Sequence, residues 1–205
     1  MDLKKKLDEF GYVEIEGSQD AETALSITTH LGNLRPLNGE VLQIVEAKAA
    51  SEATTNSFSH RVGYGAFPLH TDTAFWPKPA RYIIFQMSQP SATPSVVLPA
   101  NLTQQLFSSF RASNPVFTRE TTSGVSYSVP WLGTNLDCVF FDPCIMRPVN
   151  KAAVQLVRAI DAEFDQSIPI EWSGDKVLVV DNWRALHGRG AAMASKRKLT
   201  RFYRG

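Results

Sequence analysis

The sequence predicts a mainly β protein, a β-sandwich or jelly roll with a few helices packed outside. Short runs rich in β-branched and aromatic residues recur along the chain, turn residues separate them, and few segments have helical periodicity. The chain has 205 residues, of which 43% are hydrophobic, which suffices for one substantial core. No repeat and no linker rich in Pro, Gly or Ser divides it. We therefore expect residues 1–205 to form a single domain.

The N-terminal part predicts two helices and two strands. Residues 3–10 place apolar side chains at helical spacing, and residues 21–31 form a second helical segment that stops at a glycine. Residues 12–16 alternate as a half-buried strand does, and residues 40–45 are a further strand candidate. The polar segment 54–65 is expected to be a loop.

The remainder predicts strands, two helices and a turn. The helices are expected at residues 102–110 and 151–164, and the second has Asn150 as its N-cap. Residues 172–175 have the composition of a turn. The strands are expected at residues 81–87, 95–98, 125–129, 136–141, 177–180 and 199–203.

Composition argues against several classes of protein. The net charge is +1, from 21 basic and 20 acidic residues, so neither nucleic acid nor a membrane surface is favoured as a partner. The two cysteines, Cys138 and Cys144, allow a disulfide, but free buried thiols fit better than a secreted disulfide scaffold. No apolar signal segment or membrane-length apolar run is present. We expect a soluble cytoplasmic protein.

Two histidines and one aspartate form a candidate metal site. His70 and Asp72 are two residues apart, so on a strand their side chains point to one face, with Cα atoms about 6.6 Å apart. His187 follows the most apolar strand expected in the chain. Two imidazoles and one carboxylate are the ligands of a non-haem Fe(II) facial triad, which leaves three metal positions open. If these side chains meet in space, they predict an oxygen-activating enzyme.

Each of these residues alone also fits a plain structural role. His70 fits a loop histidine hydrogen-bonded to Asp72, and His187 fits a core histidine that bonds a backbone carbonyl. In a chain with four histidines, one His-x-Asp pair is weak evidence. The surrounding sequence must therefore decide between the interpretations.

Three blocks of sequence provide that context: residues 65–76 (GAFPLHTDTAFW), 174–189 (GDKVLVVDNWRALHGR) and 197–201 (RKLTR). The first two resemble the metal motifs of the TauD/TfdA-like (clavaminate synthase-like) Fe(II)/2-oxoglutarate-dependent oxygenases. The third is similar to the Arg-x-Leu-x-Arg element that follows them in that family. The order agrees too, with about 115 residues between the metal motifs and about ten more before the arginine element.

The resemblance implies a double-stranded β-helix (jelly roll) in which His70, Asp72 and His187 bind Fe(II) and act as the catalytic centre. It implies 2-oxoglutarate as cosubstrate, chelating the iron through its carboxylate and ketone, and O2 as the other reactant. Related halogenases replace the ligand carboxylate by a small residue to admit halide. The presence of Asp72 therefore favours hydroxylation, desaturation, epoxidation or cyclisation.

The resemblance also implies an arginine that holds the far carboxylate of 2-oxoglutarate. Arg197 opens the arginine element and is the first candidate. Arg201 lies four residues later and fits either the cosubstrate or an acid group of the substrate, because a guanidinium matches a carboxylate bidentately. Ser95 takes the place of a threonine that assists this carboxylate in the family, although the two accompanying glycines are absent.

The sequence offers weaker candidates for substrate contacts and for orienting the metal ligands. Tyr64, Trp76, Trp131 and Arg189 are candidates to line the substrate pocket, although large aromatic side chains are more often plain core. Asp181 is a candidate to orient a ligand imidazole, with a cap at the end of a strand as the alternative.

The expected substrate is a small polar molecule such as an amino acid or a specialised metabolite. The chain is short for the family that it resembles, which indicates a trimmed insert over the active site. The pocket is then either more open or covered by a partner subunit, and the oligomeric state stays undetermined.

Three alternatives remain open at this stage. They are a cupin-like non-haem iron enzyme that does not use 2-oxoglutarate, a catalytically inactive jelly-roll binding module, and a zinc hydrolase. The arginine pair opposes the first, the complete ligand set opposes the second, and the lack of an evident general base opposes the third.

Overall fold

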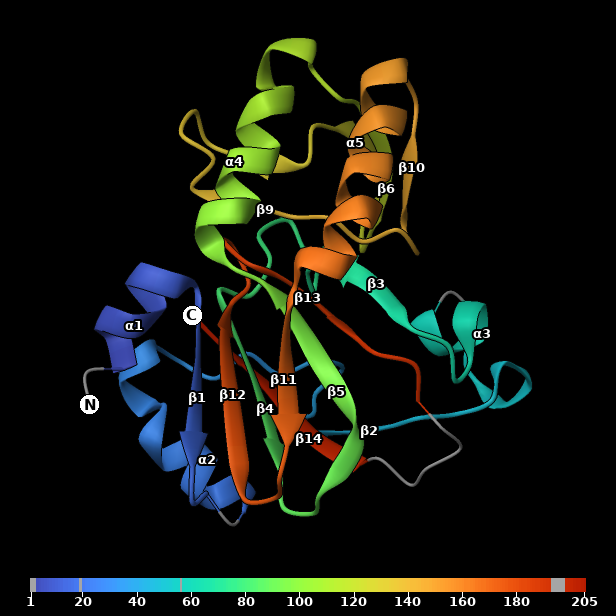
Figure 1. Cartoon of the computed structure of the whole chain (residues 1–205). Coiled ribbons are helices and arrows are strands. Elements are labelled where there is room, and N and C mark those ends of the chain that lie inside the picture. The colour runs from blue at the N-terminus through green and yellow to red at the C-terminus, as the bar shows by residue number, and fades with distance from the viewer. Residues whose placement is uncertain (1–2, 19, 56, 193–197) are drawn as a thin grey trace.

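A computed structural model of the chain describes residues 3–18, 20–55, 57–192 and 198–205 (Figure 1). The protein is mainly β, and its paired strands all run antiparallel. No helix in these described ranges has both the length and the apolar character needed to cross a membrane.

Two sheets form the body of the molecule. The five-stranded sheet has the order β1 (Tyr12–Glu16), β12 (Lys176–Asp181), β4 (Tyr82–Met87), β14 (Lys198–Arg204) and β2 (Gln43–Glu46). The four-stranded sheet has the order β11 (Ile168–Trp172), β5 (Ser91–Leu98), β13 (Leu186–Arg189) and β3 (Phe67–His70). Smaller sheets comprise β10 (Met146–Pro148), β6 (Phe117–Thr121) and β7 (Gly124–Ser128), and β8 (Trp131–Leu132) with β9 (Cys138–Val139).

The helices lie at the periphery of these sheets. In Figure 1, α1 (Leu3–Phe10) and α2 (Ala21–Ile27) flank the five-stranded sheet, whereas α4 (Ala100–Phe110) and α5 (Lys151–Ala162) stand together at the top. The short helix α3 (Phe58–Val62) lies beside β3. Short 3-10 helices occur at Thr29–Leu31, Ala50–Glu52, Arg111–Ser113 and Glu163–Gln166.

The central strand β4 shows why the five-stranded sheet is apolar on both faces. Ile83 and Phe85 point into a core shared with the four-stranded sheet, whereas Tyr82 and Ile84 point into a second core beneath α1 and α2. Successive residues of a strand face opposite sides, so a sheet covered on both faces needs apolar residues throughout. The expected strand at 177–180 is confirmed as part of β12, which is buried for the same reason.

The sequence failed to predict several short elements. The expected loop at 54–65 is wrong because it contains α3, which begins after the N-cap Ser57 and packs Phe58 against Phe67. The strand β11 was missed because Pro169 argues against a strand, but β11 lies at a sheet edge, where proline is tolerated. The expected strand at 136–141 is shortened to β9. The prediction of free buried cysteines is confirmed.

An irregularity between β3 and β13 brings the backbones of these strands unusually close. His187 pairs with His70, and Arg189 pairs with Phe67. Two steps along β13 therefore correspond to three steps along β3. Gly188 lies within this bulge, where a Cβ would come within 2.6 Å of the Phe67 carbonyl oxygen and 3.2 Å of that of Pro68. A glycine is therefore required here by the close approach of the neighbouring backbone.

We expect Gly188→Ala to lower the free energy of unfolding by about 1–3 kcal/mol, because the added methyl group must push β3 away from β13. Urea-induced unfolding of the metal-free protein measures the change. A stability equal to that of the parent would show that the bulge can accept a methyl group without displacing β3.

Candidate metal centre

The pairing of β3 with β13 brings together histidines that are far apart in the sequence. His70 ends β3 and lies opposite His187 in the register, and their ring centroids are 4.4 Å apart. One ligand atom from each of His70, Asp72 and His187 lies within 4.8 Å of the other two. The Nε2 atoms of the two histidines are 3.4 Å and 3.7 Å from Asp72 Oδ1. The three side chains can therefore contribute to one metal site.

Asp72 reaches this cluster from a turn and not from the strand on which the sequence argument placed it, because β3 ends at His70. The side-chain amide of Asn182 holds the backbone of the turn, since Asp72 N–H donates to Oδ1 of Asn182 (2.9 Å) and Nδ2 of Asn182 donates to Asp72 O (3.0 Å). The same Nδ2 also donates to Ala80 O. Asn182, which belongs to the same sequence motif as His187, thus fixes the position of Asp72.

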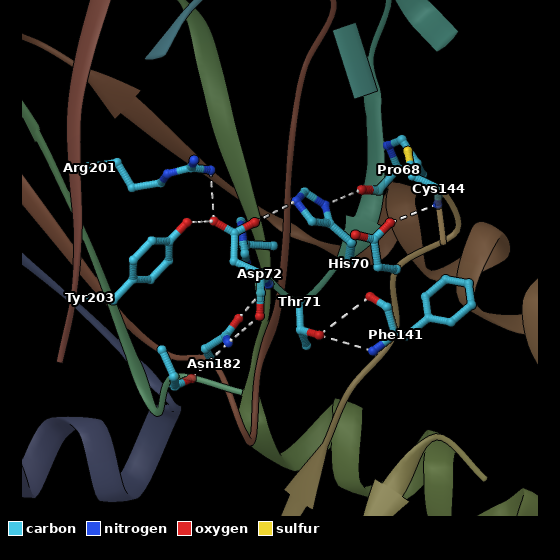
Figure 2. A network of polar contacts seen from close by, with 12 residues as sticks. Pro68, His70, Thr71, Asp72, Phe141, Cys144, Asn182, Arg201 and Tyr203 are labelled. Atoms are coloured by element: carbon cyan, nitrogen blue, oxygen red, sulfur yellow. Dashed lines mark hydrogen bonds and ion pairs between the residues drawn. The ribbon is translucent and has the colours of Figure 1, made fainter. Parts of the chain in front are cut away.

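The ring of His70 is oriented by the irregular strand that carries it. Nδ1 lies 2.8 Å from the carbonyl oxygen of Pro68, which is an acceptor only, so Nδ1 carries the proton and Nε2 is left to face Asp72 (Figure 2). Ligand histidines in proteins are usually oriented in this way. The ring of Phe58 packs against the ring of His70, with centroids 4.2 Å apart.

The two oxygens of the Asp72 carboxylate face different surroundings. In Figure 2, Arg201 and Tyr203 approach one oxygen while the other faces His70. The Arg201 Nη1 and Tyr203 hydroxyl groups both donate to Oδ2 at 2.9 Å. Oδ1 is the oxygen nearest the two imidazoles. Asp72 is therefore held at one oxygen and presents the other to the histidines.

Electrostatics keeps this carboxylate ionised. Burial raises the pKa of Asp72, but Arg201 and the two histidines outweigh burial and hold the pKa well below its usual value. Burial together with the charge of Asp72 raises the pKa of Tyr203 well above its usual value, so its hydroxyl remains a donor.

The two imidazoles respond differently to the same environment. Burial lowers the pKa of His70, but the hydrogen bond and charge of Asp72 overcome this and raise it above the usual value. Burial and the neighbouring His70 lower the pKa of His187 to about 4. A second positive charge is unfavourable beside the first in this buried cluster. His187 is therefore neutral at physiological pH, as a metal ligand must be.

A cavity borders the cluster and has both aromatic and charged walls. The three candidate ligands lie on it together with the aromatic side chains Phe58, Phe67 and Phe85. Its charged and polar lining residues are Glu46, Ser95, Arg189 and Arg201. The site is thus a pocket between the two sheets, with the candidate metal ligands at its wall.

The candidate anion-binding residues have different partners. Arg201 lies on the cavity, and its Nε is buried without a hydrogen-bond partner among the described residues. Ser95 also lies on the cavity, where its hydroxyl accepts a hydrogen bond from Trp172. Arg189 lines the cavity, but its Nη2 donates to the carbonyl oxygens of Gly63 and Gly65. Arg197 lies outside the described residues.

The other candidates are placed away from the cavity lining. Tyr64 is exposed, Trp76 packs edge-on against Tyr203, and Trp131 packs against the core near α4 and α5. None of these three aromatic residues is among those that line the cavity. Asp181 pairs with Arg81 and caps the following turn, so it takes the alternative role and does not orient a ligand imidazole.

Sequence reasoning missed Asn182, Tyr203 and Phe58 as parts of this site. Asn182 was visible within the second motif, but its sequence position does not reveal that it spans to Asp72. Tyr203 was visible as a residue two positions after Arg201 on an expected strand, which puts both on one face. Phe58 gave no usable signal, because it lies in a segment that was expected to be a loop.

Comparison with known proteins relates this arrangement to characterised folds. No protein-family model matches the chain, and no curated protein matches it. A solved asparagine oxygenase matches with a TM-score of 0.78 and 17% identity over 98% of this chain and 76% of that one. OrfP, a non-haem iron oxygenase solved with Fe and α-ketoglutaric acid, matches with a TM-score of 0.70 and 18% identity over 98% and 76%.

A third solved structure agrees with these two. PvcB, an Fe, α-ketoglutarate-dependent oxygenase from an isonitrile synthetic pathway, matches with a TM-score of 0.69 and 16% identity over 98% of this chain and 78% of that one. At such low identity the likeness concerns the fold. The chain has the fold of these oxygenases, and its site must be judged by its own residues.

The neutral, buried His187 predicts a pH dependence of stability in the metal-free protein. The unfolded chain protonates this histidine near pH 6.5, whereas the folded protein resists protonation down to about pH 4. Within that window the unfolded state binds more protons, so the free energy of unfolding falls as the pH falls, by up to about 1.4 kcal/mol per pH unit. His187→Gln should remove this part of the slope.

Urea unfolding in the presence of a chelator, repeated across this pH window, measures the slope. His30→Gln is the matched control, because His30 is exposed and does not line the cavity. A His187→Gln protein with the slope of the parent would contradict the assigned state of His187.

Proposed function

We propose that this chain is an Fe(II)/2-oxoglutarate-dependent oxygenase that oxidises a small polar substrate. One observation carries the proposal: the ligand atoms of His70, Asp72 and His187 lie within 4.8 Å of one another at the wall of a cavity that Arg201 also lines. The ligand set suits non-haem iron, and the arginine suits a carboxylate-bearing cosubstrate.

The residues fit such a metal. Donors about 2.1 Å from an ion on one face of an octahedron are about 3 Å apart. The separations of 3.4 Å and 3.7 Å from Asp72 Oδ1, with all three ligand atoms within 4.8 Å of one another, exceed this value, so the side chains would close around a bound ion. Both histidines direct Nε2 toward the aspartate. When bound there with 2-oxoglutarate, Fe(II) would supply the activation of O2 for attack on a C–H bond.

The protein itself contributes orientation and exclusion of water. Arg201 and Ser95 are the described candidates for binding the carboxylate of 2-oxoglutarate, and Arg197 is the remaining candidate. A guanidinium has five donors, so Arg201 can bind a second carboxylate while Nη1 stays on Asp72. Phe58 and Phe67 close one side of the cavity with apolar surface, which restricts solvent at the reacting centre.

The proposed function implies a finer description of the fold. We infer that the five- and four-stranded antiparallel sheets are the two halves of a double-stranded β-helix, and that residues 1–205 act as one catalytic domain. The likeness to the three oxygenases over 98% of the chain supports both inferences.

We propose an amino acid or an amino-acid derivative as the substrate class. The cavity carries charges of both signs, since Glu46, Arg189 and Arg201 are all among its lining residues, which suits a zwitterion. One matching asparagine oxygenase was solved with 3-hydroxyasparagine and succinate, and OrfP was solved with (3S)-hydroxy-L-Arg. Among the residues that the structure describes, Arg189 and Arg201 are then the candidates to bind a carboxylate of the substrate.

Anaerobic titration with Fe(II) and 2-oxoglutarate tests the proposal. We expect a metal-to-ligand charge-transfer band that His187→Ala abolishes while the protein stays folded, because two remaining ligands no longer hold the ferrous chelate. His30→Ala is the matched control and should keep the band. A parent protein without the band would contradict the use of 2-oxoglutarate.

Succinate formation under air completes this test and separates the alternatives. A screen of the common amino acids and their derivatives should find a substrate that stimulates succinate release above the background. Substrate oxidation without succinate would instead support a non-haem iron enzyme that does not use 2-oxoglutarate.

The arginine that holds 2-oxoglutarate can be identified by paired substitutions. Loss of a charge-assisted bidentate contact costs roughly 1.5–3 kcal/mol, so the correct variant should bind 2-oxoglutarate about 10- to 100-fold more weakly. Arg197→Gln and Arg201→Gln are compared through the charge-transfer titration, with the exposed Arg111→Gln as control. If both variants bind 2-oxoglutarate like the parent, neither arginine is the cosubstrate anchor.

A further inference from the structure

The carboxylate of Asp72 is saturated at one oxygen by side chains from a single strand. Arg201 and Tyr203 are two residues apart on β14, so both point from the five-stranded sheet into the space between the sheets. Each donates to Oδ2 at 2.9 Å. A carboxylate oxygen has two lone pairs in the plane of the carboxylate, and at Oδ2 the two donors occupy both. Oδ1 is therefore the oxygen that remains for a metal ion held with the two histidines.

Tyr203 has no freedom to leave this contact. Its side chain is 1% exposed, and Trp76 packs against it edge-on with ring centroids 6.0 Å apart. β14 is itself an inner strand of the sheet, where Tyr203 is paired with Ile83. A buried phenol needs a hydrogen-bond partner, and Asp72 Oδ2 is that partner here.

The consequence concerns the number of positions left open on a metal. Three ligands that each bind through one atom leave three positions of an octahedron free, and a chelating cosubstrate together with O2 requires all three. A carboxylate can also bind a metal through both oxygens, which would take one of those positions. Donors on Oδ2 oppose that second mode.

We propose that Tyr203 is a positioning residue which, with Arg201, restricts Asp72 to binding the metal through Oδ1 alone and so keeps a coordination position open. This inference rests on the proposed function, because it requires a metal bound by His70, Asp72 and His187. Tyr203 is the sharper probe of the two donors, because Arg201 is also a candidate to bind carboxylate ligands.

The test uses Tyr203→Phe, which keeps the aromatic ring and removes only the hydroxyl. Co(II) serves as an air-stable probe, and its visible absorption reports the coordination of the ion. We expect Tyr203→Phe to bind Co(II) about 10-fold more weakly, as is typical when a partner of a metal ligand is removed. We also expect an altered Co(II) spectrum and weaker binding of 2-oxoglutarate to the Co(II) protein, because Asp72 can then use both oxygens.

Tyr82→Phe is the matched control. Tyr82 lies on β4 of the same sheet but points to the opposite face, into the core beneath α1 and α2. It should keep the Co(II) affinity, the spectrum and the 2-oxoglutarate affinity of the parent. Thermal unfolding of the metal-free proteins identifies any variant whose loss of binding reflects loss of folding.

The outcomes separate this inference from the function on which it rests. If the parent binds Co(II) and 2-oxoglutarate and Tyr203→Phe equals it in affinity and spectrum, the role of Tyr203 is wrong and the function stands. If the parent binds no Co(II), both fail. A crystal structure of the parent with Mn(II) provides a test that needs no variant, because an Asp72 that binds through both oxygens would overturn the inference.

Discussion

The burial of one carboxylate, that of Asp72, is the constraint on which the rest of the site depends. An ionised carboxylate that is only 8% exposed is unfavourable unless charges and hydrogen bonds compensate for the lost water. Arg201 and Tyr203 supply that compensation at one oxygen, and the histidines face the other. A buried carboxylate oxygen that faces two imidazole rings is well suited to a divalent cation.

The two sheets position these groups because all of them come from paired strands or from turns next to those strands. β3 and β13 set the two histidines side by side, β14 brings its donors from across the core, and the amide of Asn182 ties the turn of Asp72 to the second motif. Sites built on strands hold their geometry more closely than sites on free loops. On the α3 side of the pocket, Arg189 donates to the backbone carbonyls of Gly63 and Gly65 and lies over the ring of Phe67.

Much of the fold was predictable because local pattern and burial agree. The strands β4, β12 and β14 are rich in β-branched and aromatic residues, and α5 has an N-cap and a regular apolar stripe, so each was expected close to its observed position. The short elements α3 and β11 were not, because neighbours in space stabilise them against weak local preference. Asp181 shows the same limit within the site, since only its contact with Arg81 reveals that it is a cap.

The sequence alone determined which chemistry is available: His70, Asp72 and His187 in motifs of recognisable spacing, with arginines after them. It could do so because residue type and order are sufficient to suggest a ligand set. Only the tertiary structure decided how these groups meet, since strand pairing joins His70 and His187, which are 117 residues apart (187 minus 70), and the opposite sheet supplies Tyr203. Such contacts depend on register and packing between distant segments, which no local pattern encodes.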